Sequence, residues 1–560
     1  MIYLFRLKVV LNINLCIFVF KSLVLKNLFL AVLSGLLFSL GWPTYGYPVF
    51  LFFGFLPLLL LSENYIKNKS QKHFFLYVYL AFFIWNLLKT WWIVNSTVVG
   101  GVFAIVVNSL LMSLVFWSFH WVRKRLPQRM ALAYLIFAWM SFEKFHLYWD
   151  FSWPWLNLGN GFSEQTGWIQ WYEYTGTFGG SFWILLVNII AYHYVSKYLQ
   201  TKNRKYLITG GIKVLLYIIL PIVLSQYIKS QYKIKGQTAK VSILQPNLDP
   251  WKEKFKYNNT ELTENFLELA NPDADLVVAP ETAISQYIEI ADFSYSRPYY
   301  LMKAFSQKYH THILTGVDFI HWYPKNSLDI PETANKTRRG RWYDMYNSAV
   351  LVSPDDSVQI YHKSKLVVGA EYTPFRKILE PLIGDWVTKT IGVSMGSNVS
   401  QKERSVFKVS GTPIKAAPII CYESVYGAYV TDYVKKGANL LAVITNDGWW
   451  GNTEGHRQHL SIARLRAIEN RRDVVQSANT GISAHINQLG NIEKSLGYNK
   501  RGSINTKVHL NEQQTFYTRQ GDYLARVAIF MTVLLLLYAL SKHKVFLRLS
   551  AYMVMLFTEL

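Results

Sequence analysis

The stretch IKAAPIICYE, residues 414–423, is a short apolar run that ends in a cysteine and a glutamate. Its length and its bounding polar residues are typical of a buried β-strand. Similar runs recur at VSILQPNL (241–248), DLVVAPET (275–282), HILTGVDF (312–319), NSAVLVSP (347–354) and NLLAVITNDG (439–448), with helical patterns at 260–270, 298–309 and 455–472. Strands that alternate with helices predict an α/β layered domain over residues 236–520.

The composition indicates a chain with two unlike parts. Of the 560 residues, 51% are hydrophobic and only 17% are charged. The 16% aromatic content excludes a disordered protein, and no heptad or Gly-x-y repeat supports a coiled coil or collagen. Two cysteines, Cys16 and Cys421, exclude a disulfide framework. Segment 321–343 is polar and basic, and we expect an exposed insertion there.

Apolar runs long enough to cross a membrane crowd residues 1–235 and recur once near the end of the chain. Because a spanning helix needs about 20 apolar residues, we expect such helices at 24–42, 46–62, 74–95, 98–122, 130–149, 178–196, 207–228 and 524–540. Residues 1–22 are apolar but interrupted by basic residues, which leaves open an extra helix, an interfacial segment or an untranslated start. The predicted units are a membrane part (1–235), the α/β domain (236–520) and a last helix with its tail (521–560).

The basic residues explain the net charge of +23. They gather in alternate loops of the predicted membrane part, whereas loop 150–177 carries acidic residues and no Lys or Arg. This alternation follows the positive-inside rule, so we expect a cytoplasmic N-terminus and an α/β domain on the outer side. The sequence therefore predicts a multi-pass membrane protein whose α/β domain faces the periplasm or the exterior, and it gives no support for a nucleic-acid partner.

Three reactive side chains lie at or near predicted strand ends: Glu281, Lys363 and Cys421. Loops at such ends are exposed while the strands are rigid, which suits catalytic groups. A cysteine attacks as its thiolate. A carboxylate can accept the thiol proton, and an ammonium can stabilise the thiolate and a later oxyanion. These residue types form an acyl-transfer set that needs neither histidine nor metal.

Each candidate also has an ordinary structural interpretation. A lone cysteine after an apolar strand is more often a buried filler, and Glu281 and Lys363 could belong to a solvated face. Cys421 is nevertheless the only cysteine in 236–520, where an idle thiol is open to oxidation. His456 and His459 suggest a metal pair, but no third ligand follows, so we expect a structural role. We expect no metal and no cofactor.

At these residues the sequence resembles the nitrilase, or carbon–nitrogen hydrolase, superfamily, whose catalytic set is Glu, Lys and Cys. Further words resemble the apolipoprotein N-acyltransferase family: SLGWPTYGYPVF (39–50), WPWLNLGNGFSE (153–164), LQPNLDPWKEKF, APETA, YHKSKL, GAEYTPF, ICYES, NDGWWGNTEGHRQHL, RAIENRR, ANTGIS and FYTRQGDYLAR (516–526). The resemblance implies a multi-pass α-helical membrane domain joined to an α/β nitrilase-like domain, an α-β-β-α sandwich.

The resemblance also implies roles for individual residues. Glu281 would be the general base, Lys363 the support of the oxyanion and Cys421 the nucleophile. Supporting or substrate-binding roles would belong to Glu371, Tyr422, Glu423 and Trp251. We further expect Trp449, Trp450 and the loop 366–375 to line a lipid-facing entrance.

Two positions depart from the family pattern. The usual loop reads LVPFGEYVPF, whereas this chain has LVVGAEYTPF at 366–375, which leaves the loop conformation open but keeps Glu371. Gln476 stands where an arginine is common. Neither change touches Glu281, Lys363 or Cys421, so we expect an active enzyme.

The function implied by the resemblance is the final step of bacterial lipoprotein maturation. An acyl chain would pass from a membrane phospholipid of the phosphatidylethanolamine type to Cys421, and then to the N-terminal amine of a diacylglyceryl-cysteine on an apolipoprotein. Such a reaction is ping-pong through a thioester. Its partners would be the phospholipid, the diacylglyceryl apolipoproteins and the lipid bilayer, without a cofactor.

Two alternatives remain at this stage. A membrane-tethered nitrilase-type amidase on a small periplasmic amide would share Glu281, Lys363 and Cys421 but has no use for so many helices. A transporter or receptor would need charges along a permeation path. The predicted helices offer few, namely Lys89, Glu143, Lys144 and Lys213, and each of these is near a predicted helix end or could pair locally, as Glu143 could with Lys144.

Overall fold

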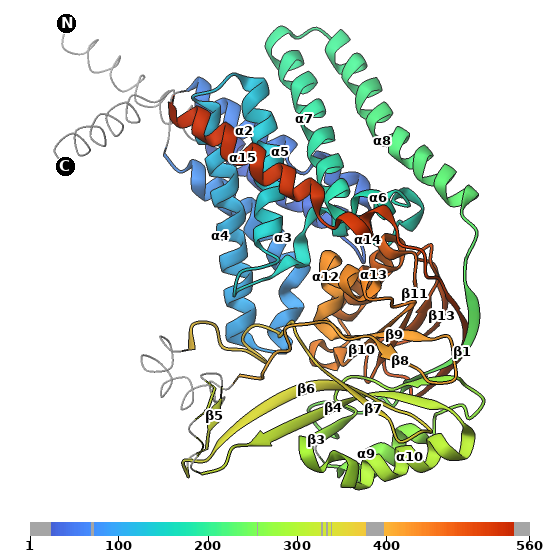
Figure 1. The fold of residues 1–560 in the computed structure, drawn as a ribbon. Coiled ribbons are helices and arrows are strands. Elements are labelled where there is room, and N and C mark those ends of the chain that lie inside the picture. Colours follow the sequence, from blue (N-terminus) through green and yellow to red (C-terminus); the bar gives the residue numbers. More distant parts are fainter. Residues whose placement is uncertain are drawn as a thin grey trace, which may run out of the picture.

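The computed structural model describes residues 24–541 except 69–71, 255, 326, 328, 332–333, 338 and 377–396. The predictions for residues 1–22 and for the tail beyond 541 lie outside the described residues. Figure 1 shows a bundle of long helices stacked on two β-sheets, with helices on the outer faces of the sheets. The predicted fold class, a helical membrane-type domain plus an α/β sandwich, is confirmed.

The helical part uses most of the first 231 residues and one late helix. Its elements are the helix Val24–Gly41, η1 (Pro48–Phe53), α2 (Leu56–Lys67), α3 (Phe74–Thr90), η2 (Trp91–Asn95), α4 (Val98–Arg123), α5 (Gln128–Phe145), η3 (Pro154–Leu156), η4 (Leu158–Phe162), η5 (Thr166–Trp168), α6 (Tyr172–Thr175), α7 (Thr177–Thr201), α8 (Lys205–Gln231) and α15 (Tyr523–Ser541). Among the described residues, seven helices are long and apolar enough to cross a membrane.

Helix α5 is the one predicted span that is not among those seven helices. It lies in the bundle and packs against α4 and α15. It carries Arg129 near its start and Glu143 and Lys144 near its end, which makes it less apolar than the others. That α5 crosses the membrane stays a prediction.

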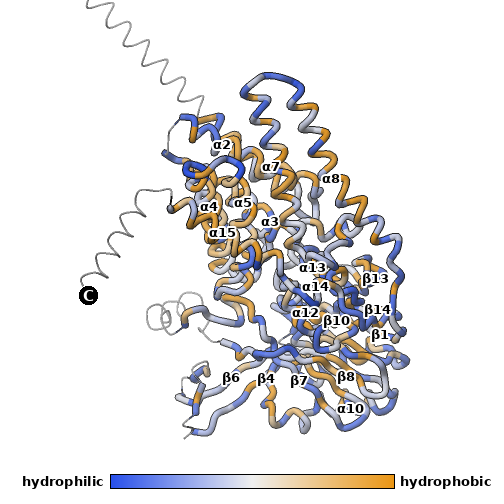
Figure 2. The backbone as a smooth tube through the Cα atoms, turned by 45° about the horizontal axis from the view of Figure 1, so that its top comes forward, coloured by the Kyte–Doolittle hydropathy of each residue, from blue (hydrophilic) through white to orange (hydrophobic). Residues whose placement is uncertain are grey.

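The surface of the bundle is apolar in its middle and polar at its ends. Figure 2 shows hydrophobic residues along the long helices and hydrophilic residues at the loop that joins α7 to α8, far from the sheets. Large apolar side chains such as Ile212 (64% exposed) and Phe530 (67% exposed) point outward. An exposed apolar surface of this kind suits a bilayer and not water, so the chain is a membrane protein.

Two lysines of the bundle pair with residues far along the chain, whereas Lys67 pairs with Glu63 within α2. Lys89 pairs with Glu454 at 3.4 Å, and Lys144 pairs with Asp522 at 2.9 Å. The expected pair of Glu143 with Lys144 is therefore wrong, because adjacent residues of a helix point in different directions. Glu143 instead accepts hydrogen bonds from the Leu158 amide and the Ser181 hydroxyl.

The α/β domain contains two sheets. The first has the order β14-β1-β2-β4-β6-β5, with β3 beside β4 and β7 beside β6; the second has the order β13-β12-β11-β10-β9-β8. The strands are β1 (Gln237–Gln245), β2 (Leu276–Val278), β3 (Ile284–Glu289), β4 (His312–Trp322), β5 (Asn335–Lys336), β6 (Trp342–Val352), β7 (Val358–His362), β8 (Phe407–Lys408), β9 (Lys415–Ile420), β10 (Leu440–Thr445), β11 (Asp473–Ala478), β12 (Ser483–Ile486), β13 (Ile492–Leu496) and β14 (Gly502–Leu510).

Helices cover the outer face of each sheet. They are α9 (Asn259–Leu267) and α10 (Arg297–Tyr309) on the first sheet, and α12 (Gly427–Lys435), α13 (Glu454–Asn470) and α14 (Phe516–Gln520) on the second, with short turns η6 (Ile290–Tyr295), η7 (Cys421–Val425) and η8 (Asp447–Trp450). Central strands such as β2 and β10 are buried along their whole length because both of their faces are covered. The layer of α12 and α13 lies between the second sheet and the bundle (Figure 1).

The two ends of the segment 321–343, which we expect to be an exposed insertion, belong to strands. Among its described residues, His321 and Trp322 end β4 and pair with Asp344 and Tyr343 of β6. The polar sequence does not predict that β4 and β6 extend into this segment as an antiparallel pair. The outer ends of these long strands are half-exposed and therefore lack an apolar run.

Gly316 of β4 lies against the backbone of Glu281 and Thr282, and a substitution there tests how closely the two segments pack. A Cβ at this glycine would lie 2.3 Å from the Thr282 nitrogen and 2.7 Å from the Glu281 Cα. We predict that Gly316→Ala lowers the free energy of unfolding by about 1–3 kcal/mol through overpacking, measured by denaturant unfolding in detergent. Gly497→Ala is the matched control, since nothing lies within 4 Å of its Cβ. Equal effects of both substitutions would contradict the close approach.

Candidate active site

Cys421 stands on a strained turn directly after β9. Its φ is +50°, in the left-handed region that non-glycine residues rarely adopt. The Ser424 hydroxyl donates a hydrogen bond to the Cys421 carbonyl at 2.8 Å, and His459 Nε2 lies 3.1 Å from the same oxygen. These two contacts hold the backbone of the turn, while Cys421 lines a cavity. The residue is 9% exposed.

His459 and Asp447 form a buried pair beneath this turn. His459 Nδ1 lies 3.0 Å from Asp447 Oδ1, and both side chains are fully buried. Burial lowers the pKa of His459, but the Asp447 carboxylate and the Cys421 carbonyl outweigh it and raise the pKa above its ordinary value. The ring of His456 packs against the ring of Tyr498, with centroids 4.6 Å apart. The described part of the chain contains no group of three His, Cys, Asp or Glu side chains that could hold a metal ion.

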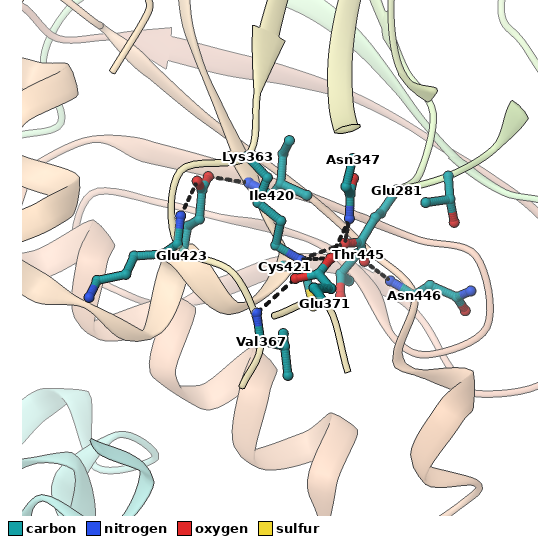
Figure 3. A network of polar contacts seen from close by, with 12 residues as sticks. Glu281, Asn347, Lys363, Val367, Glu371, Ile420, Cys421, Glu423, Thr445 and Asn446 are labelled. Carbon is teal, nitrogen blue, oxygen red and sulfur yellow. Dashed lines mark hydrogen bonds and ion pairs between the residues drawn. The ribbon is translucent and has the colours of Figure 1, made fainter. Parts of the chain in front are cut away.

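Lys363 follows β7 and places its ammonium between two carboxylates. Its Nζ lies 2.9 Å from Glu281 Oε1 and 2.9 Å from Glu371 Oε1, and the residue is 1% exposed. Figure 3 shows these groups converging beside Cys421. Burial lowers the pKa of Lys363, but the two carboxylates outweigh it and raise the pKa well above its ordinary value. Lys363 therefore stays charged at any physiological pH.

Glu281 lies just beyond β2 and is held by several donors. The Asn347 amide donates to its Oε1 at 2.8 Å, and the Asn446 backbone N–H donates to its Oε2 at 3.1 Å. Burial raises the pKa of Glu281, but the charge of Lys363 and these hydrogen bonds outweigh it and hold the pKa below its ordinary value. Glu281 is therefore a carboxylate that can accept a proton.

The Cys421 thiol is protonated in the resting site. Burial raises its pKa, Glu281 raises it further, and Lys363 compensates only in part. The three groups thus form a thiol, a carboxylate base and a fixed positive charge around one cavity. Such a set can take the proton from sulfur as it attacks a carbonyl, and can stabilise the oxyanion that forms.

Glu371 comes from the loop whose sequence departs from the family pattern. Gly369 adopts φ +79°, and the Glu371 amide donates to the Val367 carbonyl at 2.9 Å, which closes a tight turn. The Val367 amide in turn donates to Glu371 Oε2 at 2.8 Å. A glycine within this turn thus brings Glu371 to Lys363 without the Pro-Phe-Gly sequence.

Asn347 is a site residue that the sequence reasoning missed. Its side-chain amide donates to both Glu281 and Glu371, at 2.8 and 2.7 Å. It thus links the two carboxylates that hold Lys363. The sequence did contain a sign of this role: Asn347 is a polar residue at the start of the apolar run 347–354, where its side chain would face the interior.

Glu423 does not line the cavity but ties two catalytic segments together. Its Oε1 accepts the Ser364 amide at 2.8 Å, and its Oε2 accepts the Ile420 amide at 2.8 Å. Tyr361 and Tyr429 also donate to it, at 2.7 and 2.6 Å. The carboxylate therefore fixes the residue after Lys363 and the residue before Cys421, which makes it a positioning residue.

The cavity around these groups has a volume of about 380 Å³ and is lined by both parts of the molecule. Trp251 is 57% exposed at its mouth and contacts Trp449 edge-on, with ring centroids 4.8 Å apart. Trp450 lies deeper, 4.9 Å from Trp92 and 5.8 Å from Trp155 of the helical part. Tyr422 also lines the wall, and its hydroxyl donates to the Ser152 carbonyl.

Two further ionisable side chains line the cavity that the sequence reasoning did not single out. Lys254 is buried and donates to the Thr282 hydroxyl. Burial lowers the pKa of Lys254 and raises the pKa of Asp318 to about 7. The only sequence signal was the acidic residue that interrupts the apolar run of β4.

Two family models match this chain, and one of them covers the α/β domain that holds the site. The family model for carbon-nitrogen hydrolases matches residues 240–517, which include Glu281, Lys363 and Cys421. The α/β domain is therefore a catalytic domain of the carbon–nitrogen hydrolase class. The family model for the apolipoprotein N-acyltransferase N-terminal domain matches residues 34–190. The chain belongs to the apolipoprotein N-acyltransferase family, which confirms the resemblance seen in its sequence.

Relatives match along nearly the whole chain. An apolipoprotein N-acyltransferase of Chlorobaculum tepidum is 29% identical over 91% of this chain and 96% of its own length. One from Geobacter metallireducens is 26% identical over 90% of this chain and 94% of its own length. Among solved structures, a carbon-nitrogen hydrolase from Helicobacter pylori G27 is 18% identical, with a TM-score of 0.34, over 52% of this chain and 95% of that chain.

The linking role of Glu423 predicts a structural cost for its loss. Glu423→Gln replaces one of the two acceptor oxygens with an NH2 group that faces other donors. We therefore expect the free energy of unfolding to fall by about 1–3 kcal/mol and the reaction of Cys421 with an acyl donor to slow. The control is Glu512→Gln, because the Glu512 carboxylate is 65% exposed in a surface pair with Lys415. Unfolding curves in detergent that coincide for the two variants would rule out the linking role.

Proposed function

We propose that this protein transfers an acyl chain from a membrane phospholipid, through a thioester on Cys421, to the N-terminal amine of the diacylglyceryl-cysteine of apolipoproteins. One observation carries this proposal. The cavity that holds Cys421, Glu281 and Lys363 is walled partly by Ile93 and Trp155 of the helical part. A nucleophile placed at that junction suits a substrate that stays in the bilayer, and the names of the relatives agree with it.

In the first half-reaction, Glu281 takes the proton from the Cys421 thiol while the sulfur attacks the ester carbonyl of the donor. Negative charge develops on the carbonyl oxygen, and Lys363 with a backbone N–H near Tyr422 stabilises it. The carbon–oxygen bond to the glycerol then breaks, and the proton held by Glu281 passes to the leaving alkoxide. Lysophospholipid departs and the thioester remains.

In the second half-reaction, the amine of the acceptor attacks the thioester carbonyl. Glu281 accepts the amine proton, the carbon–sulfur bond breaks, and the thiolate is reprotonated as the amide is released. Water competes with the amine at this stage, because it would hydrolyse the thioester. The burial of Cys421 and the aromatic wall around it support the exclusion of water.

The arrangement of charge supports a membrane placement for the reaction. Lys202 and Arg204 lie in the loop between α7 and α8, and Lys205 begins α8, at the end of the bundle opposite the sheets. The positive-inside rule favours that end for the cytoplasm. The catalytic domain is then periplasmic at the inner membrane, where phosphatidylethanolamine-type donors and lipid-anchored acceptors share one plane and meet at high effective concentration.

The alternatives have less support. A tethered amidase would not need cavity walls from the helical part. A transporter would need charged groups along a path, but Lys89 and Lys144 are used in ion pairs with Glu454 and Asp522 of the chain that follows the bundle.

A trapping experiment tests the proposal. Purified protein is incubated with a phospholipid labelled in its acyl chain, and a hydroxylamine-labile acyl adduct is sought on the protein. We expect the adduct with the wild type and none with Cys421→Ser, since the thioester requires sulfur. Addition of a synthetic diacylglyceryl-cysteine peptide must discharge the adduct into an amide. A label that persists in Cys421→Ser would overturn the mechanism.

The base role of Glu281 predicts a change in pH dependence. Because its pKa lies below the ordinary value, Glu281 is ionised throughout pH 6–8, and the rate of wild-type acylation should be nearly flat there. Glu281→Gln should be slower by about 10²–10⁴-fold at pH 7 and should gain rate as the pH rises, because the thiol must then ionise alone. Single-turnover rates against pH measure both; a flat profile in the variant would exclude this role.

The aromatic mouth predicts a selective defect with lipid substrates. We expect Trp251→Ala and Trp449→Ala to reduce acylation by phospholipid about tenfold more than acylation by a short soluble thioester, since they remove apolar surface at the entrance. Trp450→Ala should weaken both reactions, because Trp450 packs against Trp92 and Trp155. Parallel assays with the two donors measure the ratio. If Trp251→Ala and Trp449→Ala reduce acylation by the phospholipid and by the soluble thioester to the same extent, these tryptophans do not guide lipid.

A further inference from the structure

A second pocket lies where the helical part meets the α/β domain, on the other side of the wall that carries Tyr422. Its volume is about 200 Å³. The end of α5, helix α12, the turn between α14 and α15, and the segments around Lys365 and Arg404 enclose it. Figure 1 shows α5, α12, α14 and α15 meeting at this level. We call it the basic pocket.

The lining of the basic pocket carries an excess of positive charge. Its basic side chains are Lys144, Lys365, Arg404, Lys435 and Arg526, and its acidic side chains are Asp432 and Asp522. Asp522 is taken by Lys144 at 2.9 Å. Asp432 is shared between Lys435 at 3.6 Å and Arg404 at 3.7 Å. Lysine and arginine charges therefore outnumber the carboxylates that face them.

Two of the cations are poorly satisfied. Lys365 is held by the Leu147 carbonyl at 3.1 Å and by the faces of Tyr148 and Tyr426, with no carboxylate in an ion pair among the described residues. Burial and the neighbouring charge of Arg404 lower the pKa of Lys365. The Arg404 guanidinium stacks over the Tyr429 ring at 4.0 Å and donates from Nη1 to the Lys402 carbonyl at 3.1 Å, but its Nε is buried without a hydrogen-bond partner in the described chain. Two like charges at a half-buried site, one with an idle donor, favour an anionic ligand.

The basic pocket opens at the level where lipid headgroups would lie. Arg526 is in the first turn of α15, a helix long and apolar enough to span the membrane. Phe530 and Val533, which follow Arg526 on one face of α15, are 67% and 50% exposed. Tyr148, at the end of α5, is 63% exposed beside Lys144. A ligand with a charged head in the pocket would thus find an apolar helix face below it for its tails.

The basic pocket is separate from the catalytic cavity. None of its lining residues lines the cavity of Cys421. The wall between them includes Tyr422, which lines the cavity, and Tyr426, which lines the pocket and contacts Tyr422 edge-on at 5.2 Å. One lining residue of the pocket, Tyr429, also donates a hydrogen bond at 2.6 Å to Glu423, the positioning residue of the active site.

We propose that the basic pocket binds the phosphate of an anionic phospholipid whose acyl chains lie along α15. Guanidinium and ammonium groups suit a phosphodiester, and the apolar face of α15 distinguishes a lipid from a free anion. The bound headgroup would tie together the segment after Lys363, helix α12 and the start of α15 at the membrane surface. The site requires membrane insertion but not acyl transfer, so it stands or fails independently of the function proposed above.

Lipid titration followed by native mass spectrometry tests this site. Full-length protein in a neutral detergent is titrated with phosphatidylglycerol, and the dissociation constant is measured for wild type, for the double variant Arg404→Gln/Arg526→Gln and for Arg501→Gln. Arg501 is the matched control, because it pairs on the surface with Glu268 at 2.9 Å and does not line the pocket. Removal of two cations should weaken binding roughly tenfold or more, while the control should stay within about twofold.

The possible outcomes separate the sources of the phosphate. Equal affinities in all three proteins would overturn the site, and equal binding of phosphatidylcholine would overturn its preference for anionic lipid. Inorganic phosphate at 10 mM is added as a competitor, and full displacement of the lipid would indicate a free-anion site instead. Should the double variant not fold, Arg526→Gln alone, on an exposed turn, is expected to weaken binding about threefold.

Discussion

A buried ammonium holds this active site together. Lys363 is withdrawn from water and survives there because Glu281 and Glu371 each approach it at 2.9 Å. Removing either partner from a buried ion pair leaves an uncompensated charge, at a cost of about 3–5 kcal/mol. The end of β2, the turn after β7 and the 366–375 loop are distant in sequence, and this one charge requires them to meet. The same arrangement keeps Glu281 ionised and Lys363 charged beside a protonated thiol, which is the state that a nucleophilic attack on an ester needs.

The junction with the bundle gives this chemistry its setting. The cavity is not complete within the α/β domain, because Trp155 and neighbouring residues of the helical part form one wall. The ion pair Lys89–Glu454 joins the bundle to the α/β domain at that level, and Lys144 holds Asp522 in the turn before α15. This junction suits the function proposed above, because substrates anchored in a bilayer would approach Cys421 from the side of the helical part.

Much of this organisation could be predicted from the sequence, and the omissions have physical reasons. The central strands were recognised because full burial makes them continuous apolar runs, and their ends gave Glu281 and Cys421. The ends of β4 and β6 were missed because half-exposed strands carry polar residues. Asn347 and the linking role of Glu423 depend on contacts between segments about 60 residues apart or more, which no local pattern reveals. The pairing of Glu143 with Lys144 failed because neighbours in sequence on a helix do not face each other.

The central claim is that sulfur at position 421 carries the acyl chain that ends on a lipoprotein. The most direct measurement is mass spectrometry of the N-terminal peptide of a native lipoprotein, from cells whose only source of the activity is this protein or its Cys421→Ala variant. The account predicts a triacylated cysteine with the wild type and a diacylglyceryl-cysteine with a free amine in the variant. Fully triacylated peptide in cells that carry only the variant would contradict it.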